Sequence, residues 1–122
     1  MRQASIKNHT HHLPRPIKVG VCDSFINRLR GYMFQKKIPV ENGLLFIQKN
    51  ESRLDSAIHM FFVNFDLAII WLDHQNIVVD KCLAKRWRPF YMPSRDAKMI
   101  LELHPAHLDE FSIGDNVSIS ND

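Results

Sequence analysis

The clearest indication of the fold is the stretch LAIIWLDHQNIVVDKCLA, residues 67–84. Its first six residues, 67–72, are all apolar. This predicts a strand that is buried on both faces, because a half-buried strand would alternate apolar and polar residues. The polar residues 73–76 predict a hairpin connection, and residues 77–84 predict the strand that returns beside the first. The stretch therefore predicts a β-hairpin whose first strand is central in a sheet.

Further strands and two short helices are predicted around this hairpin. The additional strands are residues 17–22, 44–47, 57–63 and 98–103, with an edge strand after Gly114. One helix is expected to follow a cap at Asp23 or Ser24 and to end at Gly31, and another to start at Pro105. About seven short strands without strand–helix alternation predict a mainly β domain, either an antiparallel sandwich or a partly closed barrel with two peripheral helices.

Length and composition favour a single globular domain. The chain has 122 residues, of which 45% are hydrophobic and 24% charged, enough for one core. Residues 1–16 are polar and end in Pro-Arg-Pro, so we expect a flexible amino-terminal tail and a domain over residues 17–120. Cys22 and Cys82 form no CxxC motif, which favours two free and mostly buried thiols.

The sequence contains no feature that predicts a membrane span or a signal peptide. No apolar run reaches the roughly 20 residues needed to cross a bilayer. The first residues lack the apolar core of a signal peptide, so a cytoplasmic location is expected.

Basic residues are distributed unevenly along the chain, whose net charge is +3. Residues 1–37 contain eight Lys or Arg residues and one acidic residue, whereas residues 38–122 contain eight and twelve. A second basic stretch, residues 81–98, contains Asp96 as its one acidic residue. Such asymmetry favours an anionic partner.

Six stretches together carry a family resemblance. They are RLRGYMF (28–34), GLLFI (43–47), IHMFFVNFDLAIIWLD (58–73), IVVDKCLAKRWRPF (77–90), AKMILEL (97–103) and IGDNV (113–117). In this order and spacing they resemble the DUF192 family, also called UPF0127, of uncharacterised bacterial and archaeal proteins. The resemblance implies a small, mainly β domain with a jelly-roll-like sandwich or barrel. It implies no known reaction, because the family has no established activity.

The resemblance also marks individual positions. Arg28, Arg30 and Gly31 match its most characteristic motif together with Met33. His59 stands in its aromatic-rich strand, and Gly114 and Asp115 match its terminal turn. Ala68 stands where many members carry Asp, so carboxylate chemistry at that position is not expected in this chain.

Arg28 and Arg30 are the first candidates for binding. Two guanidinium groups beside a tight turn at Gly31 could hold a carboxylate or a phosphate through paired hydrogen bonds. Alternatively, they could complement the dipole at the end of the predicted helix and pair with acidic residues of the chain itself. The spacing is compatible with both.

The long loop 85–96 is the second candidate. Its residues Arg86, Trp87 and Arg88 interleave cations with an aromatic ring, a composition that can neutralise phosphates and stack on bases. The same side chains could instead anchor a long loop on the body of the domain.

Histidines and nucleophiles give weaker signals. His59, His104 and His107 could form a metal site if the fold brought them together, but the HxxH here lacks the glutamate of a metalloprotease helix. No Gly-rich phosphate loop and no GxSxG motif is present. We therefore expect neither a metal nor a cofactor.

The leading functional hypothesis is a non-catalytic binding module for a small anionic ligand, a peptide or a partner protein. Its binding residues would be Arg28, Arg30 and His59, with Arg86, Trp87 and Arg88 of the long loop. This requires the fold to bring the segment after the first predicted strand next to Trp87.

Two alternatives remain. A hydrolase-like enzyme would require His59, a carboxylate such as Asp73 and an arginine in one pocket. A nucleic-acid-associated domain would require a basic face that joins residues 28–37 to residues 81–98.

Overall fold

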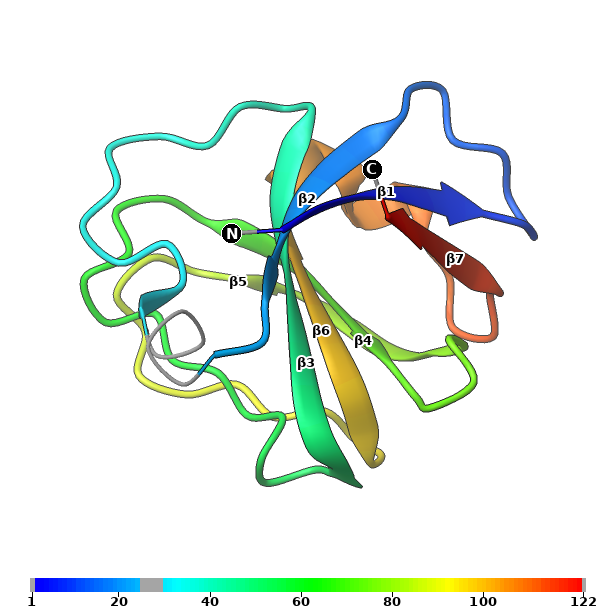
Figure 1. Cartoon of the computed structure of the whole chain (residues 1–122). Helices are drawn as coiled ribbons and strands as arrows, with labels where there is room; N and C mark the ends of the chain where they lie inside the picture. Colours follow the sequence, from blue (N-terminus) through cyan, green and yellow to red (C-terminus); the bar gives the residue numbers. More distant parts are fainter. Residues whose placement is uncertain (1, 25–29, 122) are drawn as a thin grey trace.

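The structure, a computed structural model, describes residues 2–24 and 30–121. Seven strands form one sheet in the order β5-β4-β6-β3-β2-β1-β7 (Figure 1). The strands are β1 (Gln3–Asn8), β2 (Ile17–Cys22), β3 (Asn42–Ser52), β4 (Leu67–Leu72), β5 (Val78–Ala84), β6 (Ala97–Leu103) and β7 (Val117–Asn121). Strands β2 and β3 run parallel, and the other neighbouring pairs are antiparallel. The mainly β prediction is confirmed.

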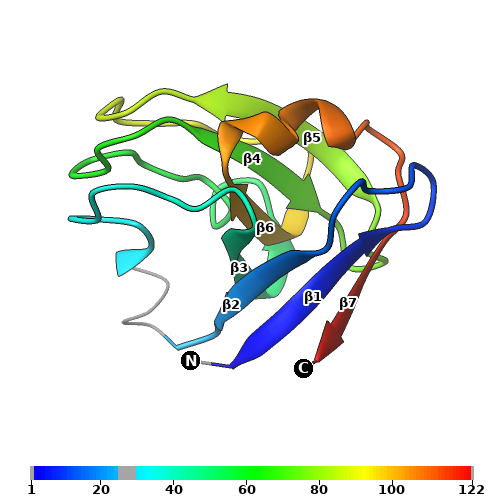
Figure 2. The same cartoon turned by 90° about the horizontal axis from the view of Figure 1, so that it is seen from above.

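The sheet curls until its two ends nearly meet. Ile77, just before β5, forms an antiparallel bridge with Asn116, just before β7. The backbone N–H of Val78 donates to the carbonyl of Asp115 at 3.0 Å, and the N–H of Gly114 donates to the carbonyl of Val78 at 2.8 Å. The result is a partly closed barrel, which Figure 2 shows from above with the short helix η1 (Pro105–Glu110) lying over β4 and β5.

Strand β4 separates two hydrophobic cores. All six of its residues are buried, as the sequence predicts. Ala68, Ile70 and Leu72 belong to the core on one face, whereas Leu67, Ile69 and Trp71 belong to the core on the other. The long apolar run therefore serves both faces of the sheet at once.

The predicted amino-terminal tail is wrong for residues 3–8. These residues form β1, which lies between β2 and β7 in the sheet. Ala4 and Ile6 are fully buried in the core, while Gln3 and Lys7 are exposed. The alternation in this strand is short and contains polar residues, so pairing with a strand on each side is needed to stabilise it.

Asp115 connects the end of β1 and the segment after it to the carboxy-terminal part of the chain. Its carboxylate accepts hydrogen bonds from Asn8 Nδ2 and from the N–H of Ser112, both at 2.8 Å, and contacts His11 Nδ1 at 3.0 Å. Although burial alone would raise the pKa of Asp115, these hydrogen bonds hold it below its ordinary value. Gly114 lies in the left-handed region beside it, with φ +96.

The strand predicted over residues 57–63 is wrong, because the segment is irregular apart from a bridge between Ile58 and Tyr91. Phe62 in this segment has φ 61, which no strand residue adopts. The helix predicted to end at Gly31 lies largely outside the described residues.

The helix expected at Pro105 is present as the 3-10 helix η1, where His104 Nδ1 accepts a hydrogen bond from the N–H of Ala106. In the described ranges, no helix has the length and apolar character required to cross a membrane.

Three irregular segments gather at one end of the barrel: residues 30–41, 53–66 and 85–96 (Figures 1 and 2). The N–H of Phe34 donates to the carbonyl of Phe62 at 2.8 Å. Met60 connects to the third segment, since its N–H donates to Arg88 O at 2.9 Å and its carbonyl accepts from the N–H of Trp87 at 3.0 Å. These hydrogen bonds join segments that are far apart in sequence.

Candidate functional site

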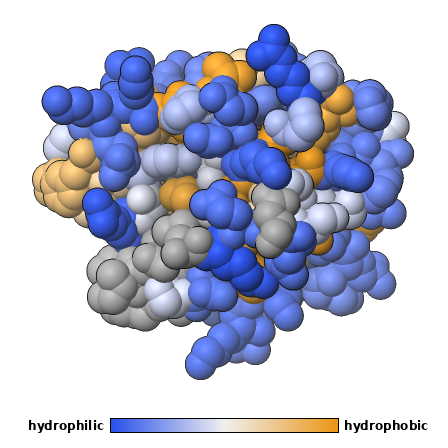
Figure 3. Space-filling model, turned by 45° about the horizontal axis from the view of Figure 1, so that its top comes forward, coloured by the Kyte–Doolittle hydropathy of each residue, from blue (hydrophilic) through white to orange (hydrophobic). Residues whose placement is uncertain are grey.

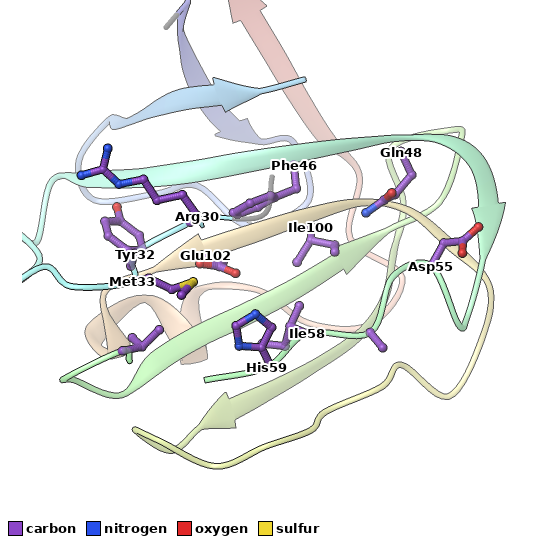
Figure 4. Close-up of a pocket in the computed structure, with 13 residues that line it drawn as sticks. Arg30, Tyr32, Met33, Phe46, Gln48, Asp55, Ile58, His59, Ile100 and Glu102 are labelled. Atoms are coloured by element: carbon purple, nitrogen blue, oxygen red, sulfur yellow. The ribbon is translucent and has the colours of Figure 1, made fainter. Parts of the chain in front are cut away.

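A cavity of about 300 Å³ lies between the sheet and the first two of these segments, residues 30–41 and 53–66 (Figure 4). Strands β3 and β6 supply one wall, through Phe46 and Gln48 and through Ile100 and Glu102. The turn at residues 30–33 and the segment at residues 55–63 supply the rest. The volume is at the small end of the range for ligand pockets, so it suits a small molecule.

Glu102 is the most unusual residue of the cavity. It is 8% exposed and lies on β6, opposite Leu44 of β3 and Ile69 of β4. Its carboxyl has no hydrogen bond or ion pair with any residue in the ranges 2–24 and 30–121. Burial raises the pKa of Glu102 to about 8. A buried acid without a partner is costly for folding, which suggests that it serves another purpose.

Gly31 closes the cavity over this carboxyl. Its φ of +48 lies in the left-handed region, which disfavours residues with a side chain. A Cβ at this position would lie 3.3 Å from Phe46 Cζ and 3.6 Å from Glu102 Oε1. The turn therefore brings its backbone directly against the aromatic ring and the acid.

Arg30 supplies the positive charge of the cavity. It is exposed and has no acidic partner within the described parts of the chain. Figure 4 shows Arg30 and Tyr32 at one end of the cavity and Gln48 and Asp55 at the opposite end. Arg30 is thus available for a ligand anion rather than occupied by an internal ion pair.

His59 and Tyr32 also line the cavity. His59 Nδ1 accepts a hydrogen bond from the N–H of Phe61 at 3.2 Å. Burial, together with the nearby Glu102, raises the pKa of Tyr32 well above its usual range, so this phenol stays protonated. The ring of Tyr32 packs edge-on against Phe65, with ring centroids 5.6 Å apart.

An exposed aromatic cluster, Phe34, Phe62 and Trp87, lies beside the cavity. The ring centroids of Phe34 and Phe62 are 5.0 Å apart, and those of Phe62 and Trp87 are 5.1 Å apart. All three residues have left-handed backbones, with φ of 67, 61 and 64. An apolar area is visible at this end of the molecule, at the left of Figure 3. The cluster brings the segment after β2 next to Trp87, although Trp87 does not line the cavity.

The arginines of the long loop contribute to its anchoring. Arg86 Nε lies 3.2 Å from Asp66 Oδ1, and Lys85 Nζ lies 3.6 Å from Asp66 Oδ2. The hydrogen bond from the N–H of Arg86 is the main cause that lowers the pKa of Asp66. Arg88 is exposed and does not line the cavity, and Arg28 lies outside the described residues. Of the predicted binding residues, Arg30 and His59 therefore share the cavity with Gly31.

The three histidines of the hypothetical metal site do not meet. His104 caps η1, while the buried His107 bonds to Glu110 Oε1 at 2.8 Å and to the carbonyl of Val40. Within residues 2–24 and 30–121, no three His, Cys, Asp or Glu residues are grouped so that they could hold a metal ion. Burial raises the pKa of Cys22 to about 12 and that of Cys82 to about 11, so neither is an activated thiol.

Sequence reasoning missed the central acid of the site. The available signal was the motif LEL (101–103), in which Glu102 stands between two leucines in a mostly apolar strand. A charged residue between apolar residues of a strand is rarely fully buried unless it is paired. Asp73, which the hydrolase hypothesis required, lies instead in the β4–β5 hairpin, where its carboxylate accepts from the N–H groups of Gln75 and Ile77.

The comparison with protein families agrees with this architecture. The profile of the DUF192 family, described as "Uncharacterized ACR", matches residues 5–119. The chain belongs to the DUF192 family. The match begins within β1, so the DUF192 domain includes most of the segment that the sequence predicted to be a tail.

DUF192 relatives occur among archaea. A UPF0127 protein of Thermococcus kodakarensis is 42% identical over 85 residues, which cover 70% of this chain and 52% of the relative. A UPF0127 protein of Pyrococcus horikoshii is 37% identical over 97 residues, which cover 80% and 81%. The chain thus spans about half the length of the Thermococcus kodakarensis relative.

Two crystal structures share the DUF192 fold seen here at low sequence identity. A "putative transcription regulator" of Sinorhizobium meliloti superposes with a TM-score of 0.83 at 13% identity, covering 97% of this chain and 92% of that one. A protein of unknown function from Novosphingobium aromaticivorans superposes with a TM-score of 0.80 at 16% identity, covering 95% and 83%. At such identities the likeness shows the fold alone.

Proposed function

We propose that this DUF192 domain is a non-catalytic binding module for a small molecule that carries an anionic group. The observation that carries the proposal is the cavity of about 300 Å³ with Arg30 at one end, which has no acidic partner among the described residues. A guanidinium group is suited to carboxylates and phosphates because it donates two parallel hydrogen bonds.

The walls of the cavity support the binding of a small organic molecule. Phe46, Ile58, Val63 and Ile100 provide apolar surface, and Gln48 provides a polar side chain at the end opposite Arg30. Apolar walls with a few polar groups that fix the orientation are typical of small-molecule sites.

The variant Arg30→Ala tests the role of the cavity. We expect it to weaken the binding of small carboxylates and phosphate by about tenfold, because one charge-assisted hydrogen-bonding group is lost. Binding is measured by titrating the labelled protein and following amide chemical shifts. The thermal midpoint should change little, since Arg30 is exposed and makes no internal ion pair within the described ranges.

Arg88→Ala is the matched control, because Arg88 is also exposed but lies outside the cavity. It should leave the affinity unchanged. Weaker binding in the Arg88 variant, with no effect in the Arg30 variant, would move the anion site to the long loop. An unchanged affinity accompanied by lost stability in the Arg30 variant would assign that arginine a structural role.

An enzymatic function is the second candidate, and one observation favours it. His59 and Glu102 line the same cavity, and the pKa of Glu102 is raised to about 8, which suits a general acid near neutral pH. Turnover of ester, amide or phosphoester substrates that is lost in both His59→Ala and Glu102→Gln would favour a hydrolase over a binding module.

Nucleic-acid binding is the third candidate, and the regulator name of the Sinorhizobium meliloti structure points in the same direction. The exposed rings of the aromatic cluster and the basic side chains of the loop are compatible with it. The pairing of Lys85 and Arg86 with Asp66 reduces the free positive charge. Affinity for single-stranded DNA or RNA that falls steeply with salt would favour this function.

A further inference from the structure

We infer that Glu102 receives an ammonium group at the floor of the cavity, so that the ligand is a small organic acid that also bears an amine. The inference rests on the proposed function, in which Arg30 holds the anionic group. It adds the second recognition element and thereby names the chemical class of the ligand.

Glu102 is a buried acid that no described residue neutralises. Its side chain is more than nine-tenths buried, yet its carboxyl has no protein partner in the described ranges. In those ranges, each side-chain polar atom that is sealed from solvent has a hydrogen-bond partner. The carboxyl oxygens therefore face the cavity instead of being enclosed in the core. A buried carboxylate gains most from a cationic partner that also donates hydrogen bonds.

The surroundings of this carboxyl are suited to an organic cation. The Phe46 ring and Glu102 Oε1 both lie within 4 Å of the position that a Cβ on Gly31 would occupy. Tyr32 and Met33 follow Gly31 and line the same space. Aromatic faces beside a carboxylate form a favourable environment for an organic cation.

Charged side chains are distributed along the length of the cavity. Arg30 lies at one end of the cavity, Glu102 lies in the middle, and Asp55 lies at the other end (Figure 4). A ligand with negative charge alone would meet one guanidinium group and two carboxyl groups. A molecule with an acid at one end and an amine further along matches the charges in their order.

The electrostatic environment of Glu102 sets the expected pH dependence. Among the titratable groups, Cys22 from β2 and Tyr32 from the turn lie close to Glu102, while Arg30, Asp55 and His59 line the same cavity. Its cross-strand neighbours on β3 and β4, Leu44 and Ile69, are apolar. Burial raises the pKa of Glu102 to about 8, and an ammonium group requires the ionised form. Affinity for an amine-bearing ligand should therefore increase as pH rises toward that value.

The experiment compares matched pairs of probes on the full chain. The amine-bearing acids are 4-aminobutanoate and 6-aminohexanoate, and the controls are butanoate and hexanoate, which lack the amine. Affinities are measured by chemical-shift titration at pH 6 and pH 9. At pH 9 we expect at least one of the two amine-bearing acids to bind about tenfold more tightly than its matched plain acid. We expect this preference to be smaller at pH 6.

Glu102→Gln keeps the size and shape of the side chain and removes its charge. We expect the variant to remain folded and still to bind the plain acids, and to lose the preference for the amine at pH 9. Loss of the preference with retained binding of the plain acids would be specific to the proposed contact.

Two outcomes would overturn the inference in different ways. The ammonium site fails, and the anion site stands, if the plain acids bind as tightly as the amine-bearing acids. The same conclusion follows if the affinity for the plain acids falls as pH rises and the affinity for the amine-bearing acids does not increase. If no probe binds, and phosphate and sulfate also fail to bind, the proposed function fails together with the inference.

Discussion

Glu102 shows how one residue can be suited to a site and poorly suited to the fold. It lies on β6 between apolar neighbours and is 8% exposed, and burial raises the pKa of its carboxyl to about 8. The folded state therefore favours the protonated acid, whereas an unfolded chain would ionise near the ordinary value of 4.5. The native state binds the proton more tightly, so folding should be most favourable at low pH as far as this group is concerned.

The variant Glu102→Gln should remove this pH dependence. The free energy of unfolding of the wild type should decrease relative to that of the variant as pH rises from about 4.5 to about 8, with a limiting slope of about 1.4 kcal/mol per pH unit. Urea denaturation at several pH values measures both proteins. Glu41→Gln, at an exposed position, is the control and should run parallel to the wild type. Parallel curves for Glu102→Gln and the wild type would show that Glu102 is not desolvated.

At the scale of elements, contacts between aromatic side chains join the three irregular segments. Phe34, Phe62 and Trp87 each come from a different segment, and each has a left-handed backbone. Such a conformation is unfavourable for a residue with a side chain by roughly 1 to 2 kcal/mol. Contacts between the rings offset part of that strain. Strain concentrated at one end of a domain is common where binding residues are positioned.

Substitutions at Phe62 should reverse the usual ranking of alanine and glycine. Both Phe62→Ala and Phe62→Gly lose the ring contacts, but only glycine relieves the left-handed backbone. Phe62→Gly should therefore be more stable than Phe62→Ala by about 1 kcal/mol, measured by chemical denaturation. Phe61 is the matched control, because it is an exposed neighbour without a left-handed backbone. There alanine should be as stable as glycine or more stable.

At the scale of the whole molecule, β1 completes the barrel. It joins β2 to β7, and β7 approaches β5 through the bridge between Ile77 and Asn116. Ile6 of β1 is buried in the core on that side of the sheet. Without β1, the strands β2 and β7 would each expose an unpaired edge, which favours aggregation.

Ile6→Ala should lower the free energy of unfolding by about 2 to 5 kcal/mol, because it opens a cavity in a packed core. Lys7→Ala, on the exposed face of the same strand, should change it by less than about 0.5 kcal/mol. Urea denaturation of the full chain measures both variants against the wild type. Equal, small effects at both positions would mean that residues 3–8 are a tail after all.

The sequence alone determined the central hairpin, the mainly β class and the family, because these depend on local patterns. The apolar run 67–72 predicts a strand buried on both faces, and Pro105 predicts the start of a short helix. Residues 57–63 have the composition of a strand, but apolar composition does not distinguish a strand from a loop whose rings pack on other loops. Motif positions single out Arg30 and His59 as candidates without any knowledge of their surroundings.

Only the tertiary structure decided which of these residues meet. β1 is too short and too polar to be identified from its own sequence, because the strands on each side stabilise it. The importance of Glu102 depends on its burial by β3, β4 and the turn at Gly31. Arg86 is a predicted ligand-binding residue, but its pairing with Asp66 depends on a contact across 20 positions of sequence. Local patterns set the conformation of each segment, whereas desolvation and charge pairing depend on neighbours that are distant in sequence.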